Sequence, residues 1–345
     1  MNSKLKIFHL YGNKQNLGDW GSAEGIKFLL KKYLNTSIYF EDHFFSFSNL
    51  KTKDIDNINN NFDMVIIGGG GIYRPSSKKI LFKVSEKQLK KINKPIITYG
   101  VGVNIENDEI KEKNSLNNKI LKLDKILKLS SVRDFKSRKY FEKNNINTNL
   151  VPCPSMFLES NINFDLLNEY KNKKIGFVLI PLCRIPEEYQ KNYIKILFDF
   201  IVNKKKEYDC FLISHSKQLE DSYYKLSKDL DIQLIYATNP NQLMSIYKQM
   251  DFVIGSRGHM SIFALGANTP FINLSYNLKC DAFVEMINYP KELSEKIENL
   301  NYEELIKKFD FLIKNEEKIK KILFSKKQKF LKLNKHYIDS IKKML

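Results

Sequence analysis

The feature that most constrains the fold of this chain is a recurring unit: a short apolar run, a glycine-containing or polar turn, and a segment with helical spacing. In the first half the apolar runs are Leu5–Tyr11, Ser37–Phe40, Asp63–Ile67, Pro95–Tyr99 and Ser131–Arg133. In the second half they are Ile175–Ile180, Cys210–Ser214, Gln233–Tyr236, Phe252–Ile254 and Phe271–Leu274. Apolar strands that alternate with helices predict parallel sheets covered on both faces. The predicted fold class is therefore α/β, with two Rossmann-like domains.

The division of the chain follows from its length and from one irregular segment. A chain of 345 residues is long for a single core. Residues 151–172 contain prolines and show no clear period, so we place the domain boundary there. We expect an N-terminal domain over residues 1–160, a second domain over 173–300 and a basic helical tail over 301–345.

The tail from Tyr302 to Leu345 carries 13 lysines against 6 acidic residues. Its apolar residues keep a helical spacing, which predicts that one face packs on the domains while the lysines are solvated. A helix that lies on a membrane surface is the alternative.

The net charge of +18 would suit nucleic acid, an anionic membrane or acidic small molecules. Most of the excess is Lys, accompanied by much Asn and Ile, a mixture that an A/T-rich genome also produces. We attribute the charge to that background. No nucleic-acid-binding signature accompanies it, so no nucleic-acid partner is predicted.

The location of the protein is predicted from its cysteines and its apolar runs. The four cysteines, Cys153, Cys183, Cys210 and Cys280, form no C-x-x-C pair, which argues against a zinc site and a disulfide framework. The first residues lack a secretory pattern and no run is long enough to span a membrane. We expect a cytoplasmic protein, and any contact with the inner membrane or a lipid-linked glycan is expected to be peripheral.

The most informative stretch is Asp251–Lys279. A strand stops at Gly255 and helical spacing resumes at Met260, so the intervening Ser256-Arg257-Gly258-His259 is a strand-to-helix turn. Such a turn lies at the carboxyl edge of a parallel sheet and opens a helix whose free N–H groups attract anions. Arg257 adds a fork for phosphate or carboxylate, and His259 a proton carrier, which together predict an anion whose chemistry needs a proton. The alternative is an Arg and a His that only cap the turn.

Two further segments in the first domain are candidates for ligand contact. Gly68–Gly71 follows a buried strand, where glycines allow backbone N–H groups to approach a ligand; a close-packed turn is the alternative. We single out Gly69, Gly70 and Gly71. Asn16-Leu17-Gly18-Asp19 follows the first strand, and Asp19 is expected to orient a substrate hydroxyl or to cap a helix that begins near Gly21.

Other charged side chains also fall at strand ends. Arg is scarce beside Lys, so Arg74, Arg133 and Arg184 near sheet edges are candidates for two-pronged anion contacts. His215 ends a strand of the second domain and is a candidate substrate ligand, with a plain strand-end His as the alternative. Neither a G-x-S-x-G elbow nor an H-E-x-x-H motif is present, so hydrolase chemistry has no support.

Five blocks in order together resemble the polysaccharide pyruvyltransferase family. The blocks are NLGD (Asn16–Asp19), DMVIIGGGGIY (Asp63–Tyr73), YGVGV (Tyr99–Val103), SVRDFKS (Ser131–Ser137) and the stretch Val253–Lys279. The resemblance implies a cytoplasmic enzyme with two Rossmann-like domains facing across a cleft, in a GT-B-like arrangement. Its members commonly move pyruvate from phosphoenolpyruvate onto a sugar as a ketal.

The resemblance also implies roles for single residues. Arg257 and His259 match the family's Arg and His, and Tyr276 and Lys279 look like its downstream Tyr and Lys. His259 is then the candidate general acid, Arg257, Ser256 and Lys279 the donor ligands, and Asn16 and Asp19 with the glycines the acceptor ligands. No metal or other cofactor is expected besides phosphoenolpyruvate as co-substrate.

Two departures from the family pattern leave donor and acceptor less defined than the fold. The residue between Arg and His is Gly258 where Leu is usual, and Cys153-Pro154 replaces an Asp-Pro pair. The alternative enzyme is a GT-B glycosyltransferase that uses a nucleotide sugar. A carbohydrate- or membrane-associated binding protein that acts through its tail is the non-enzymatic alternative.

Overall fold

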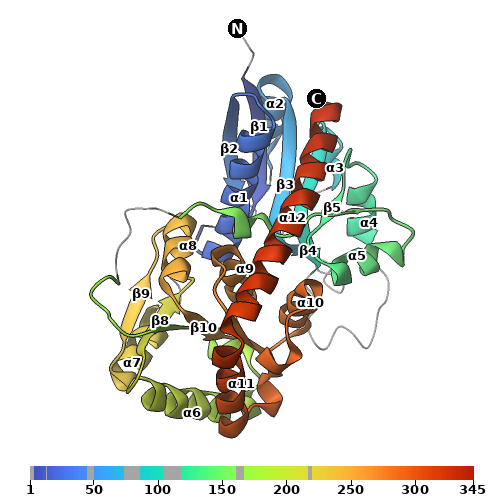
Figure 1. Cartoon of the computed structure of the whole chain (residues 1–345). Coiled ribbons are helices and arrows are strands. Elements are labelled where there is room, and N and C mark those ends of the chain that lie inside the picture. Colours follow the sequence, from blue (N-terminus) through green and yellow to red (C-terminus); the bar gives the residue numbers. More distant parts are fainter. Residues whose placement is uncertain are drawn as a thin grey trace. The chain divides into compact units, whose positions relative to one another are not determined.

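The computed structural model describes residues 4–12, 14–44, 50–73, 86–103, 118–160, 167–216 and 220–345. The chain divides into two compact units (Figure 1). Unit 1 comprises residues 1–157 and 329–345, and unit 2 comprises residues 158–328. Each unit is built on its own six-stranded sheet, and every strand pairing between described residues is parallel. The prediction of an α/β fold with two Rossmann-like domains is confirmed.

Unit 1 alternates strands with helices, and its strands β1 to β5 follow the order that the sequence predicts. Its elements are β1 (Leu5–Tyr11), α1 (Leu17–Tyr33), β2 (Ile38–Phe44), α2 (Thr52–Asn61), β3 (Met64–Tyr73), α3 (Glu86–Leu89), β4 (Ile96–Val103), α4 (Asn118–Asp124), β5 (Ser131–Val132), α5 (Phe135–Glu142), β6 (Asn149–Leu150) and the short 3-10 turn η2 (Pro154–Phe157). The sheet order is β2-β1-β3-β4-β5-β6. The sequence did not predict α2, because its Asn-rich residues favour turns and only Ile55 and Ile58 are buried.

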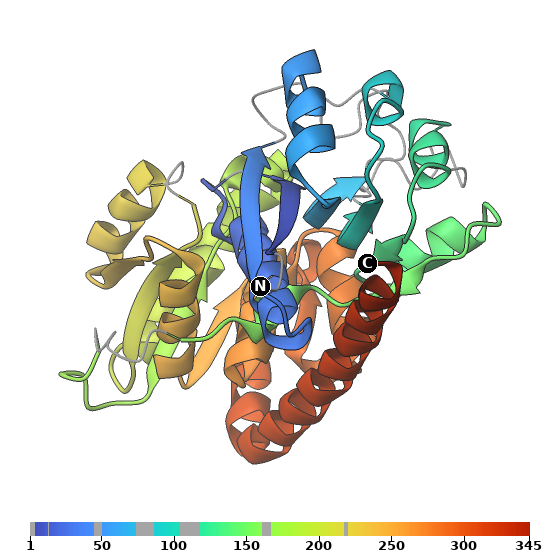
Figure 2. The ribbon, with the colours of Figure 1, turned by 90° about the horizontal axis from the view of Figure 1, so that it is seen from above.

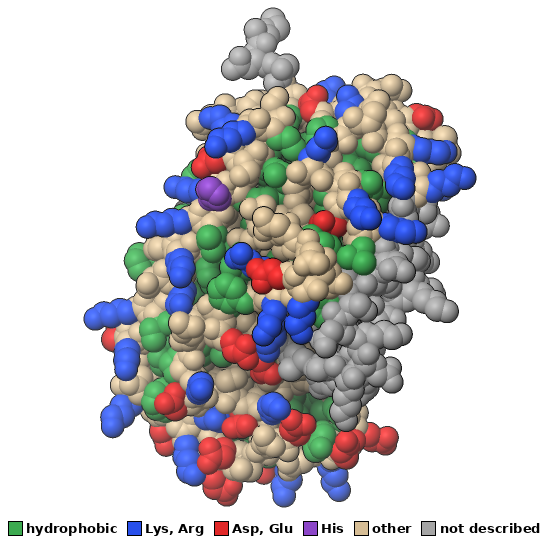
Figure 3. Space-filling model, turned by 90° about the vertical axis from the view of Figure 1, so that its right-hand side faces the viewer, with side chains coloured by type: hydrophobic (Ala, Val, Ile, Leu, Met, Phe, Trp, Pro, Cys, Tyr) green, Lys and Arg blue, Asp and Glu red, His purple; other side chains and the backbone are tan. Residues whose placement is uncertain are grey.

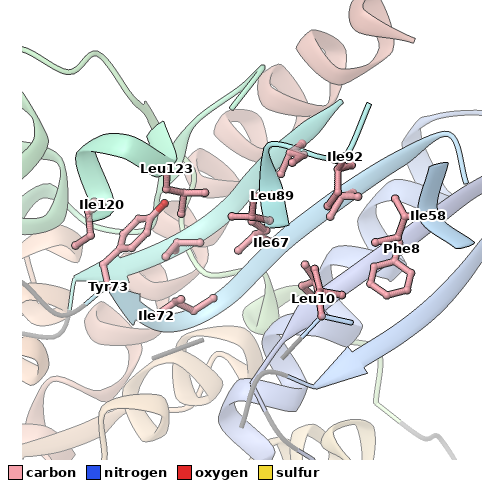
Figure 4. Close-up of a cluster of buried hydrophobic side chains, with 14 of the residues drawn as sticks. Phe8, Leu10, Ile58, Ile67, Ile72, Tyr73, Leu89, Ile92, Ile120 and Leu123 are labelled. Carbon is pink, nitrogen blue, oxygen red and sulfur yellow. The ribbon is translucent and has the colours of Figure 1, made fainter. Parts of the chain in front are cut away.

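The core of unit 1 holds α2, α3 and α4 on the sheet. Figure 4 shows Ile58 of α2, Leu89 of α3 and Leu123 of α4 gathered with side chains of the strands, among them Phe8 and Ile67. All five are at most 2% exposed. Apolar burial of this kind, about 25 cal/mol per Å² of area removed from water, is the main stabilising contribution to such a unit.

The glycine run Gly68–Gly71 and the pair Gly100 and Gly102 lie inside strands, which corrects the prediction that they form turns. Gly68–Gly71 belong to β3, where Gly68 pairs with Tyr99 and Gly70 with Val101 of β4. The physical reason is close packing: a Cβ on Gly69 would lie 2.6 Å from the Cβ of Ser22 in α1. Glycine is required here because the neighbouring helix leaves no room for a side chain.

Unit 2 repeats the alternation. Its elements before the tail are β7 (Lys174–Val178), the 3-10 turn η3 (Leu182–Arg184), α6 (Glu187–Lys204), β8 (Asp209–Ser214), α7 (Glu220–Leu230), β9 (Gln233–Tyr236), α8 (Pro240–Gln249), β10 (Phe252–Gly255), α9 (Gly258–Ala267), β11 (Phe271–Ser275), α10 (Leu278–Ile287), η5 (Lys291–Leu293), β12 (Ser294–Lys296) and η6 (Ile297–Asn299). The sheet order is β12-β11-β10-β7-β8-β9. The strands predicted for this half agree with β7 to β11 to within two residues at either end.

The C-terminal tail is helical, as predicted, but it consists of two helices. They are α11 (Tyr302–Lys314) and α12 (Glu316–Met344), and they are separated at Asn315. Helix α12 starts in unit 2 and ends in unit 1, and it is continuous in both views (Figures 1 and 2). Its apolar face is buried, for example at Leu323 and Ile341, which supports the packing prediction.

The buried face of α12 carries polar anchors in unit 1. Asn334 is fully buried; its Oδ1 accepts a hydrogen bond from the Tyr99 hydroxyl at 3.0 Å, and its Nδ2 donates to the Pro152 carbonyl at 3.2 Å. The Tyr337 hydroxyl donates to the Thr98 carbonyl at 2.6 Å. The last turns of the tail are therefore part of the unit 1 core.

The surface charge has no single focus on the face that Figure 3 shows. Lys and Arg side chains are spread over this face, and Asp and Glu are interleaved with them toward one end. That distribution favours the background interpretation of the net charge. Among the described residues, none of the helices combines the length and the apolar character needed to cross a membrane.

Candidate functional site

Each sheet has one position where the chain reverses its direction of growth. In unit 2 the chain starts at β7, adds β8 and β9 on one side, and then returns to add β10 on the other side. In unit 1 the corresponding position lies between β1 and β3. Open α/β sheets bind ligands outside the carboxyl ends of the two strands at such a switch point. The candidate residues are therefore expected to lie at the carboxyl ends of β7 and β10 in unit 2 and of β1 and β3 in unit 1.

The turn after β10 lies at the switch point of unit 2. A Cβ on Gly255 would lie 2.1 Å from the Val178 carbonyl oxygen, so glycine is needed for the close approach of β10 to β7. Ser256 is fully buried; its Oγ accepts a hydrogen bond from the Ile180 N–H at 3.2 Å and lies 2.9 Å from the Tyr193 hydroxyl. The Ser256 hydroxyl therefore holds the ends of β7 and β10 together, although the sequence predicts it as a substrate ligand.

Arg257 is the residue that precedes α9, and its side chain is half-buried. The first turn of α9 contains no acidic residue, so the partial positive charge of the helix start adds to that of the guanidinium. The Arg257 charge acts on four groups of unit 2, namely His215 after β8, Tyr276 after β11, Tyr223 in α7 and Tyr247 in α8. Arg257 thus lies within electrostatic range of several side chains at the carboxyl edge.

Two histidines belong to this edge. His215 is fully buried, and its Nε2 lies 2.8 Å from the Tyr247 hydroxyl. Burial, with a further contribution from Arg257, holds the pKa of His215 well below its usual value, so this imidazole is neutral at pH 7. His259 lies in the first turn of α9, two residues after Arg257, and is 5% exposed.

Tyr276 follows β11 and is half-buried. Burial first, and the neighbouring Cys280 second, raise the pKa of its phenol to about 12, while Arg184 and Arg257 act in the opposite direction. Tyr276 is therefore a neutral hydrogen-bonding group at pH 7. The side chain of Lys279 and all of Arg74 lie outside the described residues.

In unit 1 the predicted residues meet at the β1/β3 switch point. Helix α1 begins at Leu17, and its cap is Asn16, whose Oδ1 accepts from the Gly18 N–H at 3.1 Å. The alternative role of Asp19 as the helix cap is therefore wrong, because the helix begins earlier than predicted. Asp19 lies in the first turn, where its Oδ2 accepts from Asn16 Nδ2 at 2.9 Å.

The Asp19 carboxylate lies against the glycine strand. A Cβ on Gly70 would lie 2.6 Å from Asp19 Oδ1, and Gly70 has a φ of 93°, which L side chains rarely adopt. Gly69 and Gly71 flank it in β3. The NLGD and GGGG blocks, distant in sequence, thus form one edge at which a carboxylate lies beside glycine backbone.

Arg133 follows β5 at the same edge of the unit 1 sheet and is 5% exposed. Its Nε lies 3.5 Å from the Asp134 carboxylate, and Gly102 leaves the space in which the guanidinium lies. Within the described residues its Nη1 has no hydrogen-bond partner. A buried guanidinium with an unused donor is suited to an anionic ligand.

Sequence reasoning missed several residues that support these edges. Tyr193 and Tyr247 are fully buried and hydrogen-bonded to Ser256 and His215. His9 is fully buried in β1, and its Nε2 lies 2.7 Å from the Gly68 carbonyl. Their role depends on contacts between distant segments, and no spacing in the sequence marks them.

The four cysteines, all of which lie in described segments, are free thiols, and Cys153 packs beside the Ser22 and Ser155 hydroxyls. In the part of the chain that the structure describes, no three His, Cys, Asp or Glu side chains converge as a metal site would require.

Comparison with solved structures shows the same fold in enzymes that act on sugar nucleotides. A Listeria monocytogenes protein assigned as a UDP-N-acetylglucosamine 2-epimerase has a TM-score of 0.63 at 12% identity, over 93% of this chain and 91% of its own. The UDP-GlcNAc 2-epimerase of Neisseria meningitidis, bound to UDP-GlcNAc, has a TM-score of 0.57 at 10% identity, over 92% and 94%. The E. coli ADP-heptose LPS heptosyltransferase II has a TM-score of 0.52 at 11% identity, over 91% and 100%. These similarities show a GT-B-like fold class.

Comparison with families and with curated proteins gives the identity. No curated protein matches this chain significantly. The family model described as polysaccharide pyruvyl transferase matches residues 16–277, from the cap of α1 to the end of the turn after β11. That range includes Asn16, Asp19 and the glycines of β3 in unit 1 and the turn after β10 in unit 2. The chain therefore belongs to the polysaccharide pyruvyl transferase family and is a pyruvyltransferase.

Proposed function

We propose that this enzyme transfers the pyruvyl group of phosphoenolpyruvate to two hydroxyls of a sugar in a surface polysaccharide or its precursor, forming a ketal. The observation that carries the proposal is the opposite electrostatic character of the two switch points. Unit 2 presents Arg257 at the start of a helix that has no acidic residue in its first turn. Unit 1 presents the Asp19 carboxylate in the first turn of α1.

The donor is assigned to unit 2 because phosphoenolpyruvate carries a phosphate and a carboxylate. Arg257 and the positive end of the α9 dipole suit the phosphate. The neutral His215 and Tyr276 can hydrogen-bond to anionic oxygens without a competing negative charge. Lys279 remains a predicted donor ligand from the family resemblance.

The acceptor is assigned to unit 1 because a carboxylate favours hydroxyl groups over anions. Asp19 accepts a hydrogen bond from a sugar hydroxyl, and Asn16, Gly18 and the glycines of β3 provide amide and backbone groups beside it. Arg133 provides a cation at the same edge for the carboxylate of an acidic acceptor.

The proposed reaction balances without an added redox partner. A proton adds to the methylene carbon of phosphoenolpyruvate, and the oxygen of one sugar hydroxyl attacks C2 and loses its proton. The C2–O bond to phosphate then breaks and inorganic phosphate leaves. The second hydroxyl attacks C2 and loses its proton, which closes the ketal.

His259 is the proposed source of the first proton. It lies in the first turn of α9, two residues after Arg257, and an imidazole is the side chain best suited to carry a proton near neutral pH. His215, which is buried and neutral, is the less suitable acid and is assigned to positioning.

The test is mass spectrometry of sugar-lipid and free oligosaccharide precursors after incubation with the enzyme and phosphoenolpyruvate. The expected product gains the mass of pyruvic acid less one water, and inorganic phosphate appears in equal amount. A product that instead gains a sugar residue, formed only from a nucleotide sugar, would replace this proposal with a glycosyltransferase. The fold shared with the heptosyltransferase makes that the relevant competing outcome.

A further inference from the structure

Arginine is rare in this chain, and most of its positions share one feature. Only 5 of the 57 basic residues are Arg, and four of them, at positions 74, 133, 184 and 257, lie just after predicted or observed strands. The fifth, Arg138, pairs with Glu142 on the surface of α5 at 2.8 Å. The sequence names all four as candidates for anion contact, and Arg184 is the one in the described part of the chain to which the proposed function gives no role.

Arg184 lies at the switch point of unit 2. It ends η3, the turn that follows β7, and β7 pairs directly with β10, the strand that precedes Arg257. Because the two strands are parallel, both arginines follow the carboxyl ends of neighbouring strands. Arg184 and Arg257 therefore lie in two turns that emerge side by side from the same edge of the sheet.

The Arg184 side chain is exposed to solvent. Within the described residues no carboxylate forms an ion pair with it, in contrast to Arg133 and Arg138, which both lie beside carboxylates. An unpaired guanidinium at a sheet edge can bind a carboxylate through two parallel hydrogen bonds, which a lysine cannot do.

Tyr276 connects the two arginines electrostatically. This residue follows β11, on the other side of β10 from β7. The positive charges of Arg184 and Arg257 both act on its phenol, so both guanidinium groups lie within range of one hydroxyl. The three residues follow three neighbouring strands of one sheet, β11, β10 and β7, at its carboxyl edge.

We propose that Arg184 forms a second anion subsite on unit 2, which binds the carboxylate of a small phosphorylated acid whose phosphate is bound at Arg257. The phosphate is assigned to Arg257 because the N–H groups of α9 are beside it, whereas η3 is too short to offer such a helix start. The inference rests on the proposed function in that it takes phosphoenolpyruvate to be the donor.

The test compares two stable probes: 2-phospholactate, with both anionic groups, and isopropyl phosphate, in which a methyl group replaces the carboxylate. Calorimetric affinities are measured for the full chain and for Arg184→Gln, Arg257→Gln and the matched control Arg138→Gln. We expect Arg184→Gln to weaken 2-phospholactate about tenfold, the range of one charge-assisted pair, and to leave isopropyl phosphate within about twofold. Arg257→Gln should weaken both probes, and Arg138→Gln neither.

The outcomes separate this subsite from the reaction itself. An unchanged affinity of Arg184→Gln for 2-phospholactate, equal weakening of both probes, or no binding of 2-phospholactate to the wild type would each overturn the subsite. If the probes behave as expected but no pyruvyl transfer occurs in the mass-spectrometric test, the subsite stands and the proposed function fails. If pyruvyl transfer occurs and Arg184→Gln has the same KM for phosphoenolpyruvate as the wild type, the proposed function stands and the subsite fails.

Discussion

The Asp19 carboxylate occupies the space that a side chain at Gly70 would need: a Cβ there would lie 2.6 Å from Asp19 Oδ1. The two residues are separated by most of α1 and by β2 and α2 in the sequence, yet they form one edge at the β1/β3 switch point. The carboxylate of Asp19 can occupy this position only because residue 70 has no side chain.

Gly70→Ala is expected to reduce stability and activity together. The φ of 93° costs an L residue about 1–3 kcal/mol, and the new methyl group displaces Asp19. The measurement is urea unfolding together with turnover. In the double variant Gly70→Ala/Asp19→Ala the clash is absent and only the backbone strain remains, so it should be more stable than the sum of the two single effects predicts. Strict additivity would show that the contact has no energetic consequence.

His259→Ala is expected to lower turnover by roughly 100-fold or more while the fold survives, because a positioned general acid contributes about that factor. Turnover is followed by phosphate release, and the fold by circular dichroism. His215→Gln is the informative comparison, since a positioning role predicts a smaller loss of turnover. Near-normal turnover in His259→Ala would remove this residue from the mechanism.

Arg257→Lys is expected to raise the donor KM while the charge is retained, because an ammonium cannot replace the planar fork of the guanidinium. Initial rates are measured over a range of phosphoenolpyruvate concentrations at saturating acceptor. The surface variant Arg138→Lys serves as the control for a general effect of the exchange. An unchanged donor KM would contradict the assignment of Arg257 to the donor.

His9 is expected to make the fold sensitive to acid. Burial, followed by the charge of Lys27, lowers its pKa to about 4, against 6.5 in the unfolded chain. The unfolded state therefore binds the proton first, so the stabilising contribution is complete above about pH 6.5 and is lost as the pH falls toward 4. At pH 5 the loss amounts to about 2 kcal/mol.

The check is urea unfolding at pH 7.5 and pH 5 for the wild type and His9→Gln, which retains a donor for the Gly68 carbonyl. The difference in stability between the two pH values should be smaller in the variant by about 2 kcal/mol. Parallel losses in both proteins would assign the acid sensitivity to other groups.

Asn334→Ala is expected to destabilise unit 1 by about 1–3 kcal/mol, because the Pro152 carbonyl loses a donor and the Tyr99 hydroxyl its acceptor inside the core. Lys332→Ala, at an exposed position of the same helix, is the control and should change stability by less than about 0.5 kcal/mol. Thermal unfolding of both variants is the measurement. Equal stability of the two variants would contradict a role of the tail in the core of unit 1.

The sequence predicts the strands and the turn at Ser256 to His259 because apolar runs and breaks in spacing are local signals. It could not show that Gly68–Gly71 continue a strand, since the reason for those glycines is the approach of Ser22 and Asp19 from α1. The same holds for Ser256, whose hydroxyl contacts Ile180 and Tyr193, residues more than 60 positions away. The sequence thus shows which residues lie at strand ends. Whether each of them contacts a ligand or supports the structure depends on the tertiary fold.

The path of α12 determines how this protein can be dissected. Because residues 329–345 belong to unit 1, a cut after residue 157 leaves the amino-terminal fragment without Asn334 and Tyr337 and exposes Thr98 and Tyr99 to water. Chimaeras that exchange donor and acceptor specificities between relatives must therefore transplant this closing segment together with residues 1–157. A shortened chain in which a linker joins these two pieces would be the smallest form of unit 1 expected to fold alone.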